Sequence, residues 1–149
     1  TVTASQNRIT EFGFDSGMDP ADISFSPNFT ASSVVTWEAL NRLNEEGVGS
    51  TCLFEWSARH VGKQYLDNTS SDVRSLDACN VHDARVRWMW HRTNGSYVAV
   101  SAYLRNFLDA QYSANGWAYF YEVEGEEISE VYVYPQAGRH GLLALEFSF

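Results

Sequence analysis

The stretch at residues 84–105, ARVRWMWHRTNGSYVAVSAYLR, contains the clearest local fold signal in the chain. Asn94 and Gly95 lie between two runs of alternating β-forming residues, and these two residue types reach the positive φ angles of a type I′ turn at low cost. The stretch therefore predicts an antiparallel hairpin with a two-residue loop, in which Trp90 pairs with Ala99. In that register both faces are substantially apolar. A hairpin of this kind belongs in the middle of a sheet, with another layer covering each side.

Length and composition predict one folded domain over residues 1–149. The chain is rich in aromatic residues, and 44% of it is hydrophobic, which is typical of a globular protein. The formal net charge is −9, from 10 Lys and Arg against 19 Asp and Glu. Such a charge repels nucleic acid and anionic membranes, and no apolar run is long enough to span a bilayer. We therefore expect neither nucleic acid nor membrane as a partner.

The cysteines and sequons bear on the compartment. Cys52 and Cys79 allow one disulfide in an oxidising compartment or two free thiols in the cytosol. Sequons beginning at Asn28, Asn68 and Asn94 are candidate glycosylation sites. The first residues, TVTASQNR, have the look of a mature terminus left after a signal peptide was removed. We expect a secreted, extracellular protein; a cytosolic bacterial module with free thiols is the alternative.

Residues 37–46 show the signals of a short amphipathic helix. Thr36 is a plausible N-cap, Glu38 lies in the first turn, and Gly47 suits the position just past the helix end. Apolar residues at helical spacing would then share one face: Trp37, Leu40 and Leu43. The pattern predicts a helix lying on the sheet.

The rest of the chain predicts strands and one polar excursion. Strands are expected at residues 8–14, 23–25, 51–61, 117–124, 127–134 and 142–149, with a turn at Gly125-Glu126 and a helical turn within 106–116. The polar residues 63–79 look like a surface excursion, which a disulfide between Cys52 and Cys79 would tie back to the preceding strand. The predicted class is α+β: an antiparallel sheet of at least four strands, one or two helices packed on it, and one disulfide.

No familiar catalytic motif is present in the sequence. The most enzyme-like hypothesis is a ribonuclease-type site, in which Glu55, Arg87 and His91 project from one sheet face to move protons and hold a phosphate. The alternative is an ordinary stripe of surface charges. We assign no catalytic residue and keep a secreted hydrolase as the second hypothesis.

Metal binding is a weaker possibility. Cys79 and His82 have the spacing of two zinc ligands, but the others would have to come from Cys52 and a distant histidine. A disulfide is the more economical use of the cysteines. We expect no metal and no cofactor.

Aromatic and basic side chains form the candidate interaction surface. The aromatic set could stack on sugars or bases, or contact a protein, unless another layer of the fold covers it. Neighbouring glutamates make nucleic acid the least expected of these ligands. The surface consists of Arg85, Arg87, His91, Trp117, Tyr119, Tyr121, Tyr132 and Tyr134.

Three features together resemble a known family. They are EALN at residues 38–41, a cysteine-bearing strand after the expected helix, and RVRWMWHR at residues 85–92. The chain resembles the secreted avirulence effectors of plant-pathogenic fungi, in particular the Leptosphaeria avirulence-suppressing structural group. Members of that group carry several disulfides, whereas two cysteines allow one here. The Alt a 1-like β-barrels are similar in cysteine spacing, but the expected helix argues against them.

The resemblance implies a function without catalysis. It suggests a secreted protein, with uptake into host cells as a further step, that binds a host plant protein or is recognised by an immune receptor. The group offers no catalytic residue to carry over. We expect the chain to act as a monomer.

Overall fold

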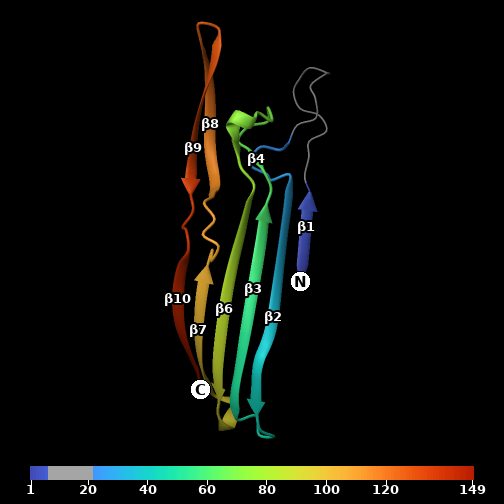
Figure 1. Cartoon of the computed structure of the whole chain (residues 1–149), viewed down its shortest axis with the longest axis vertical. Helices are drawn as coiled ribbons and strands as arrows, with labels where there is room; N and C mark the ends of the chain where they lie inside the picture. The colour runs from blue at the N-terminus through green and yellow to red at the C-terminus, as the bar shows by residue number, and fades with distance from the viewer. Residues whose placement is uncertain (7–21) are drawn as a thin grey trace.

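The computed structural model describes residues 1–6 and 22–149, and its largest unit is one antiparallel sheet. The expected strand at 8–14 lies outside the described residues. Figure 1 shows the six strands side by side as an open sheet. In spatial order they are β1 (Val2–Gln6), β2 (Phe29–Leu43), β3 (Gly49–Val61), β6 (Cys79–His91), β7 (Tyr97–Arg105) and β10 (His140–Ser148).

Two small sheets extend this unit. β4 (Gln64–Tyr65) pairs with β5 (Ser75–Leu76) within the polar excursion. β8 (Ser113–Val123) and β9 (Glu126–Pro135) form a hairpin that continues beyond β7 and β10 as an arm (Figure 1). The described helical segments are two short 3₁₀ turns, η1 (Asp72–Arg74) and η2 (Thr93–Gly95). None of the helices in the described ranges is long and apolar enough to cross a membrane.

The α+β prediction was wrong, because the expected helix at 37–46 belongs largely to β2. β2 pairs with β3 along nearly its whole length, and these ladder hydrogen bonds override the local helix signals. A β-bulge at Ala39 explains the misleading pattern. The bulge inserts one residue, so Trp37 and Leu40 share a sheet face although they are three positions apart.

The predicted disulfide was also wrong, since both cysteines are free. Cys52 pairs with Trp88 and Cys79 pairs with Val61. These pairs are nine positions apart along the ladder, which corresponds to roughly 30 Å at a rise of about 3.3 Å per residue. Nine is an odd number, so the two thiols also point to opposite faces of the sheet.

The hairpin at 84–105 is confirmed as an interior pair of strands, but its register differs from the prediction by one residue. The amide of Arg92 donates to the carbonyl oxygen of Ser96 at 2.8 Å, which leaves a three-residue loop. Trp90 consequently pairs with Val98 rather than Ala99. A shift of one residue moves every side chain of β7 to the other face.

The observed register separates two chemically different faces. The first, here called the apolar face, carries on strands β2, β3, β6, β7 and β10 the residues Trp37, Phe54, Val86, Trp88, Trp90, Val98, Val100, Leu104, Leu143, Leu145 and Phe147. The second, here called the arginine–tyrosine face, carries Glu55, Arg85, Arg87, His91, Tyr97, Tyr103, Arg105 and Glu146.

The buried apolar side chains are few and of small to moderate size in the described part of the chain. They are Cys52, Leu66, Leu76, Val81 and Ala99. The expected covering layers do not exist in residues 1–6 and 22–149, and the large residues of the apolar face remain exposed. That part of the prediction was wrong.

In the β8–β9 hairpin, the predicted division of side chains between the two faces is confirmed, but the turn differs from the prediction. Its two-residue loop is Glu124-Gly125, with φ of 53° and 86°, as a type I′ turn requires. Val123 therefore pairs with Glu126, a shift of two residues from the expected register, which leaves each side chain on its predicted face.

The remaining expectations have mixed outcomes. The strands at 51–61 and 142–149 are confirmed within β3 and β10. The strand at 23–25 and the helical turn within 106–116 were wrong: the first is a turn, and the second contains the start of β8. Asn106, with φ of 48°, organises the connection into β8, because its side-chain nitrogen donates to Ala110 O at 2.9 Å and to Ala137 O at 3.3 Å.

Candidate interaction surfaces

The arginine–tyrosine face brings together the predicted residues Arg85, Arg87 and His91. Alternation along β6 places all three on one side of the sheet, because they occupy every second position. The ring of Tyr103 lies close to two guanidinium groups, at 5.0 Å from Arg85 and 5.6 Å from Arg105. Cation–π contacts of this kind keep the arginine side chains flat against the sheet.

Two ion pairs lie on this face. Arg87 donates to Glu146 at 2.8 Å, and Arg105 donates to Asp83 at 2.9 Å. The hydroxyl of Tyr97 also donates to Glu146, and this bond raises the pKa of Tyr97. The carboxylate of Glu146 thus joins strands β6, β7 and β10 on one face.

Arg85 differs from its neighbours. Glu55 is its direct partner in the ladder, yet no described carboxylate lies within ion-pair distance of the Arg85 guanidinium. The Nε atoms of Arg85 and Arg87 are buried without a hydrogen-bond partner among the described residues. Because the Arg85 guanidinium has no ion-pair partner among the described residues, an incoming carboxylate would gain a charge-assisted hydrogen bond by pairing with it.

The residues of the ribonuclease hypothesis share this face but do not converge. Arg87 and His91 are four positions apart on β6, or about 13 Å. Glu55 lies opposite Arg85, six positions from His91, or about 20 Å. His91 Nε2 is hydrogen bonded to Thr51 Oγ1 at 3.1 Å. Proton transfer and phosphate binding at one reacting centre need groups within hydrogen-bond reach of it, which these spacings do not provide.

The predicted aromatic set forms a stacked row on the arm. Trp117 stacks on Tyr132 at 4.7 Å between centroids and on Tyr119 at 5.3 Å. Tyr119 in turn stacks on Tyr121 at 6.0 Å. No described layer buries these rings, and Tyr134 at the end of β9 is also exposed. Since neighbouring rings cover one another's faces, the row offers edges and hydroxyls rather than a flat platform for a sugar or base.

Glu130 joins three hydroxyls of this row. Tyr119 donates to it at 2.8 Å, Tyr121 at 3.2 Å and Tyr132 at 2.7 Å. The hydrogen bonds from Tyr132 and Tyr119 hold the pKa of Glu130 below its usual value. The reciprocal bond to Glu130 raises the pKa of Tyr119 to about 12. The cluster therefore keeps its carboxylate ionised and its phenols protonated.

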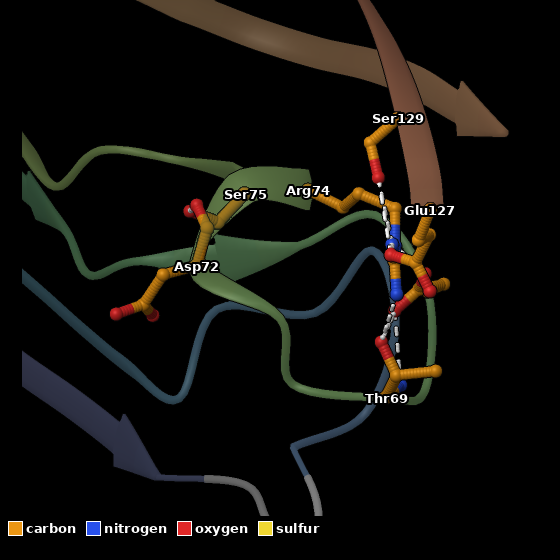
Figure 2. Close-up of polar contacts among 7 residues, drawn as sticks. Thr69, Asp72, Arg74, Ser75, Glu127 and Ser129 are labelled. Atoms are coloured by element: carbon orange, nitrogen blue, oxygen red, sulfur yellow. Dashed lines mark hydrogen bonds and ion pairs between the residues drawn. The ribbon is translucent and has the colours of Figure 1, made fainter. Parts of the chain in front are cut away.

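Figure 2 shows the polar contacts of Arg74, a residue that was not singled out from the sequence. Arg74 is the most deeply buried charged residue of the described chain. It is 4% exposed and lies over the ring of Phe120 at 4.5 Å. Its guanidinium donates to Asp67 at 2.5 Å, Glu127 at 2.6 Å, Ser129 at 2.9 Å and Thr69 at 3.0 Å. This set, here called the Arg74 clamp, fastens the polar excursion to the arm.

Its partner Asp67 is held ionised. Burial alone would raise the pKa of Asp67, but hydrogen bonds from Thr69 and Arg74 lower it below its ordinary value. Each of the three guanidinium nitrogens of Arg74 donates to a protein oxygen. The Arg74 clamp is therefore an ion-pair network within the fold. The sequence signal was an arginine within an otherwise acidic and hydroxyl-rich excursion.

An open cavity of about 360 Å³ lies between the excursion and the base of the arm. Cys79, Tyr112, Val133 and Pro135 contribute to its lining. Burial raises the pKa of the Cys79 thiol, which favours the unreactive protonated form. Cys79 and His82 are three positions apart on β6 and so lie on opposite faces. Among the residues with described positions, no group of three or more metal-ligating side chains occurs.

The three sequons differ in accessibility. Asn94 is exposed at the tip of the β6–β7 hairpin. Asn68 is half-buried, and its Oδ1 accepts a hydrogen bond from the Ser24 amide at 2.9 Å. Asn28 is also half-buried. Glycosylation stays a prediction, and Asn94 is the site best placed to accept it.

Comparisons with known proteins add no relative. A scan of protein-family models, a search of curated proteins and a search of solved structures each gave no match. The resemblance to fungal effectors therefore remains a prediction from short motifs.

Proposed function

We propose that the protein acts by binding another protein, and that the arginine–tyrosine face makes the contact. The observation that carries the proposal is the half-buried Arg85, which stacks near Tyr103 and has no carboxylate partner among the described residues. Arginine and tyrosine, together with tryptophan, are the residues most enriched where binding energy concentrates in protein interfaces. An acidic group of the partner is the natural ligand for Arg85.

The setting of Arg85 favours a macromolecular partner. The face is the open surface of a sheet, whereas small-molecule sites are concave and enclose their ligand. The side chains around Arg85 are already ordered by cation–π and ion-pair contacts, so little entropy is lost on binding. A secreted effector that binds a host plant protein or an immune receptor would use such a surface, and this remains our proposal for the biological role.

Affinity capture from plant extract tests the proposal. We expect a partner that the wild-type protein retains and the Arg85→Glu variant loses, because the new carboxylate would repel the partner's acidic group. Arg139→Glu is the matched control, since it makes the same charge change at an exposed site on the loop before β10. Equal retention by both variants would exclude the arginine–tyrosine face as the contact.

The hydrolase alternative is tested with the same preparation. Wild-type protein and the His91→Ala variant are incubated with RNA, and degradation is followed over time. We expect equal background from both proteins. Degradation that is faster with wild type, and lost in the variant, would support an enzyme instead.

A further inference from the structure

The apolar face is the largest unexplained feature of the fold. It extends over five adjacent strands of the main sheet, β2, β3, β6, β7 and β10, and its large residues are exposed, Trp37 at 63% and Leu145 at 59%. By contrast, Thr51, Ala99 and Ser101 on the opposite face are buried beneath the long arginine and tyrosine side chains. The chemically polar side of the sheet is therefore better covered than the apolar side.

Exposure of this extent is costly. A typical monomer exposes no contiguous apolar patch above a few hundred Å². Where β7 and β10 lie, five strands are side by side, so four strand spacings of about 4.8 Å and a nine-residue ladder of about 3.3 Å per residue give the face a footprint of roughly 570 Å². Two such faces in contact would bury roughly 1,100 Å², which is above the area of about 1,000 Å² that a specific protein interface needs.

The charge distribution selects among possible occupants. Arg42, near the loop end of β2, is the single formally charged residue among the paired positions of the apolar face. The rest of the protein is strongly acidic, which disfavours an anionic membrane as the occupant. Two identical apolar faces meet without bringing like charges together at their centres.

The relief of the face suits a second copy. Large side chains lie beside small ones along the ladder: Trp88 is adjacent to Cys52, Trp90 to Ser50, and Phe54 to Val86. In a two-fold arrangement the same surface supplies both ridges and hollows, so the ridges of one copy can enter the hollows of the other. Two sheets packed about 10 Å apart in this way form a β-sandwich.

We propose that two copies of the chain pack through their apolar faces into a homodimeric β-sandwich. This assembly replaces the monomer expected from the sequence. It does not depend on the proposed function, because the arginine–tyrosine face lies on the outer side of each sheet. The large apolar side chains that stay exposed among the described residues of one copy are then buried between two.

Sedimentation of the purified chain tests the proposal. We expect a mass of about twice 16.8 kDa at micromolar concentration. Leu145→Arg should raise the dissociation constant by about 100-fold or more, because each copy would bury an unpaired charge. Leu142→Arg is the matched control: Leu142 is on the same strand, 61% exposed, and faces the opposite side, so this variant should remain dimeric.

A second measurement covers the case in which Leu145→Arg fails to fold. Trp37, Trp88 and Trp90 all lie on the apolar face, so dilution of the wild-type dimer should shift tryptophan emission to longer wavelength and increase acrylamide quenching. A wild-type monomer with accessible tryptophans at all concentrations would overturn the proposal. A dimer that persists in a folded Leu145→Arg protein would be joined elsewhere, for example along the β10 edge, and would overturn it as well.

Discussion

At the scale of single residues, Arg74 is where one substitution should have the largest effect on stability. The Arg74→Met variant keeps an unbranched side chain over Phe120 and removes all four hydrogen bonds. We expect the free energy of unfolding to fall by about 3 kcal/mol, because the loss leaves Asp67 without its ionic partner. Urea denaturation measures the change. Arg74→Lys should recover less than half of the loss, since an ammonium group cannot reproduce the planar fork.

Glu130 sets the titration of the tyrosine row. In the Glu130→Gln variant the pKa of Tyr119 should fall from about 12 towards its ordinary value of about 10, because the carboxylate that stabilises the protonated phenol is gone. Ultraviolet absorbance titration of the phenols detects the shift. Glu124→Gln, at the exposed turn of the same arm, should leave the curve unchanged. An unaltered curve in Glu130→Gln would contradict the hydrogen-bonded cluster.

For side chains on one strand without a bulge, the sequence predicted correctly which of them share a face. Arg85, Arg87 and His91 were expected on one face, and they are, because alternation along a single strand needs no knowledge of its neighbours. Arg74 could not be found in this way. Its acceptors Glu127 and Ser129 are more than fifty residues away, and no local pattern encodes such a contact.

At the scale of elements, the β2–β3 hairpin depends on close backbone contact at Gly49. A Cβ atom at Gly49 would lie 1.8 Å from the Arg42 carbonyl oxygen. We expect Gly49→Ala to destabilise the protein by about 3 kcal/mol through strain and overpacking. Gly47→Ala meets no atom within 4 Å and should cost only about 1 kcal/mol, because its φ of 74° is still unfavourable. Thermal unfolding of both variants gives the comparison, and equal losses would contradict the contact.

Attachment of the arm should depend on pH. The folded-state pKa of Asp67 is lower than its unfolded value, so its carboxylate contributes stability above the ordinary pKa of about 3.9. That contribution is lost as the pH falls through the folded-state pKa. Hydrogen exchange in β8 and β9 should therefore accelerate more than exchange in β3 when the pH is lowered below about 4. In Arg74→Met the two regions should respond alike.

The elements themselves illustrate why the strands were easier to predict than the helix. β3 and β10 show plain alternation and were found. β2 contains a bulge at Ala39, which turned a period of two into an apparent helical spacing. The predicted registers of the two hairpins were wrong in different ways. A register error of one residue at Asn94-Gly95 placed every β7 side chain on the wrong face of the sheet. A register error of two residues at Gly125-Glu126 left every side chain of the arm on its predicted face.

At the scale of the whole molecule, the sequence predicted a sheet covered by other layers, and the described chain supplies one sheet without them. The hydrophobic fraction of a sequence indicates that apolar surface will be buried. It does not indicate whether that surface is buried within one chain or between two copies. If two copies form the core, the unfolding temperature should rise with protein concentration, since association is coupled to folding. Calorimetry over a hundredfold concentration range checks this. Leu145→Arg should show no such dependence, and its presence there would contradict the face-to-face arrangement.

The Arg74 clamp has one practical consequence for handling the protein. Trypsin must take an arginine side chain into its own acidic pocket before it can cut the following peptide bond. The bond between Arg74 and Ser75 is therefore shielded for as long as that side chain is engaged with the arm. A tryptic fragment that ends at Arg74 would therefore show that the arm has detached from the polar excursion.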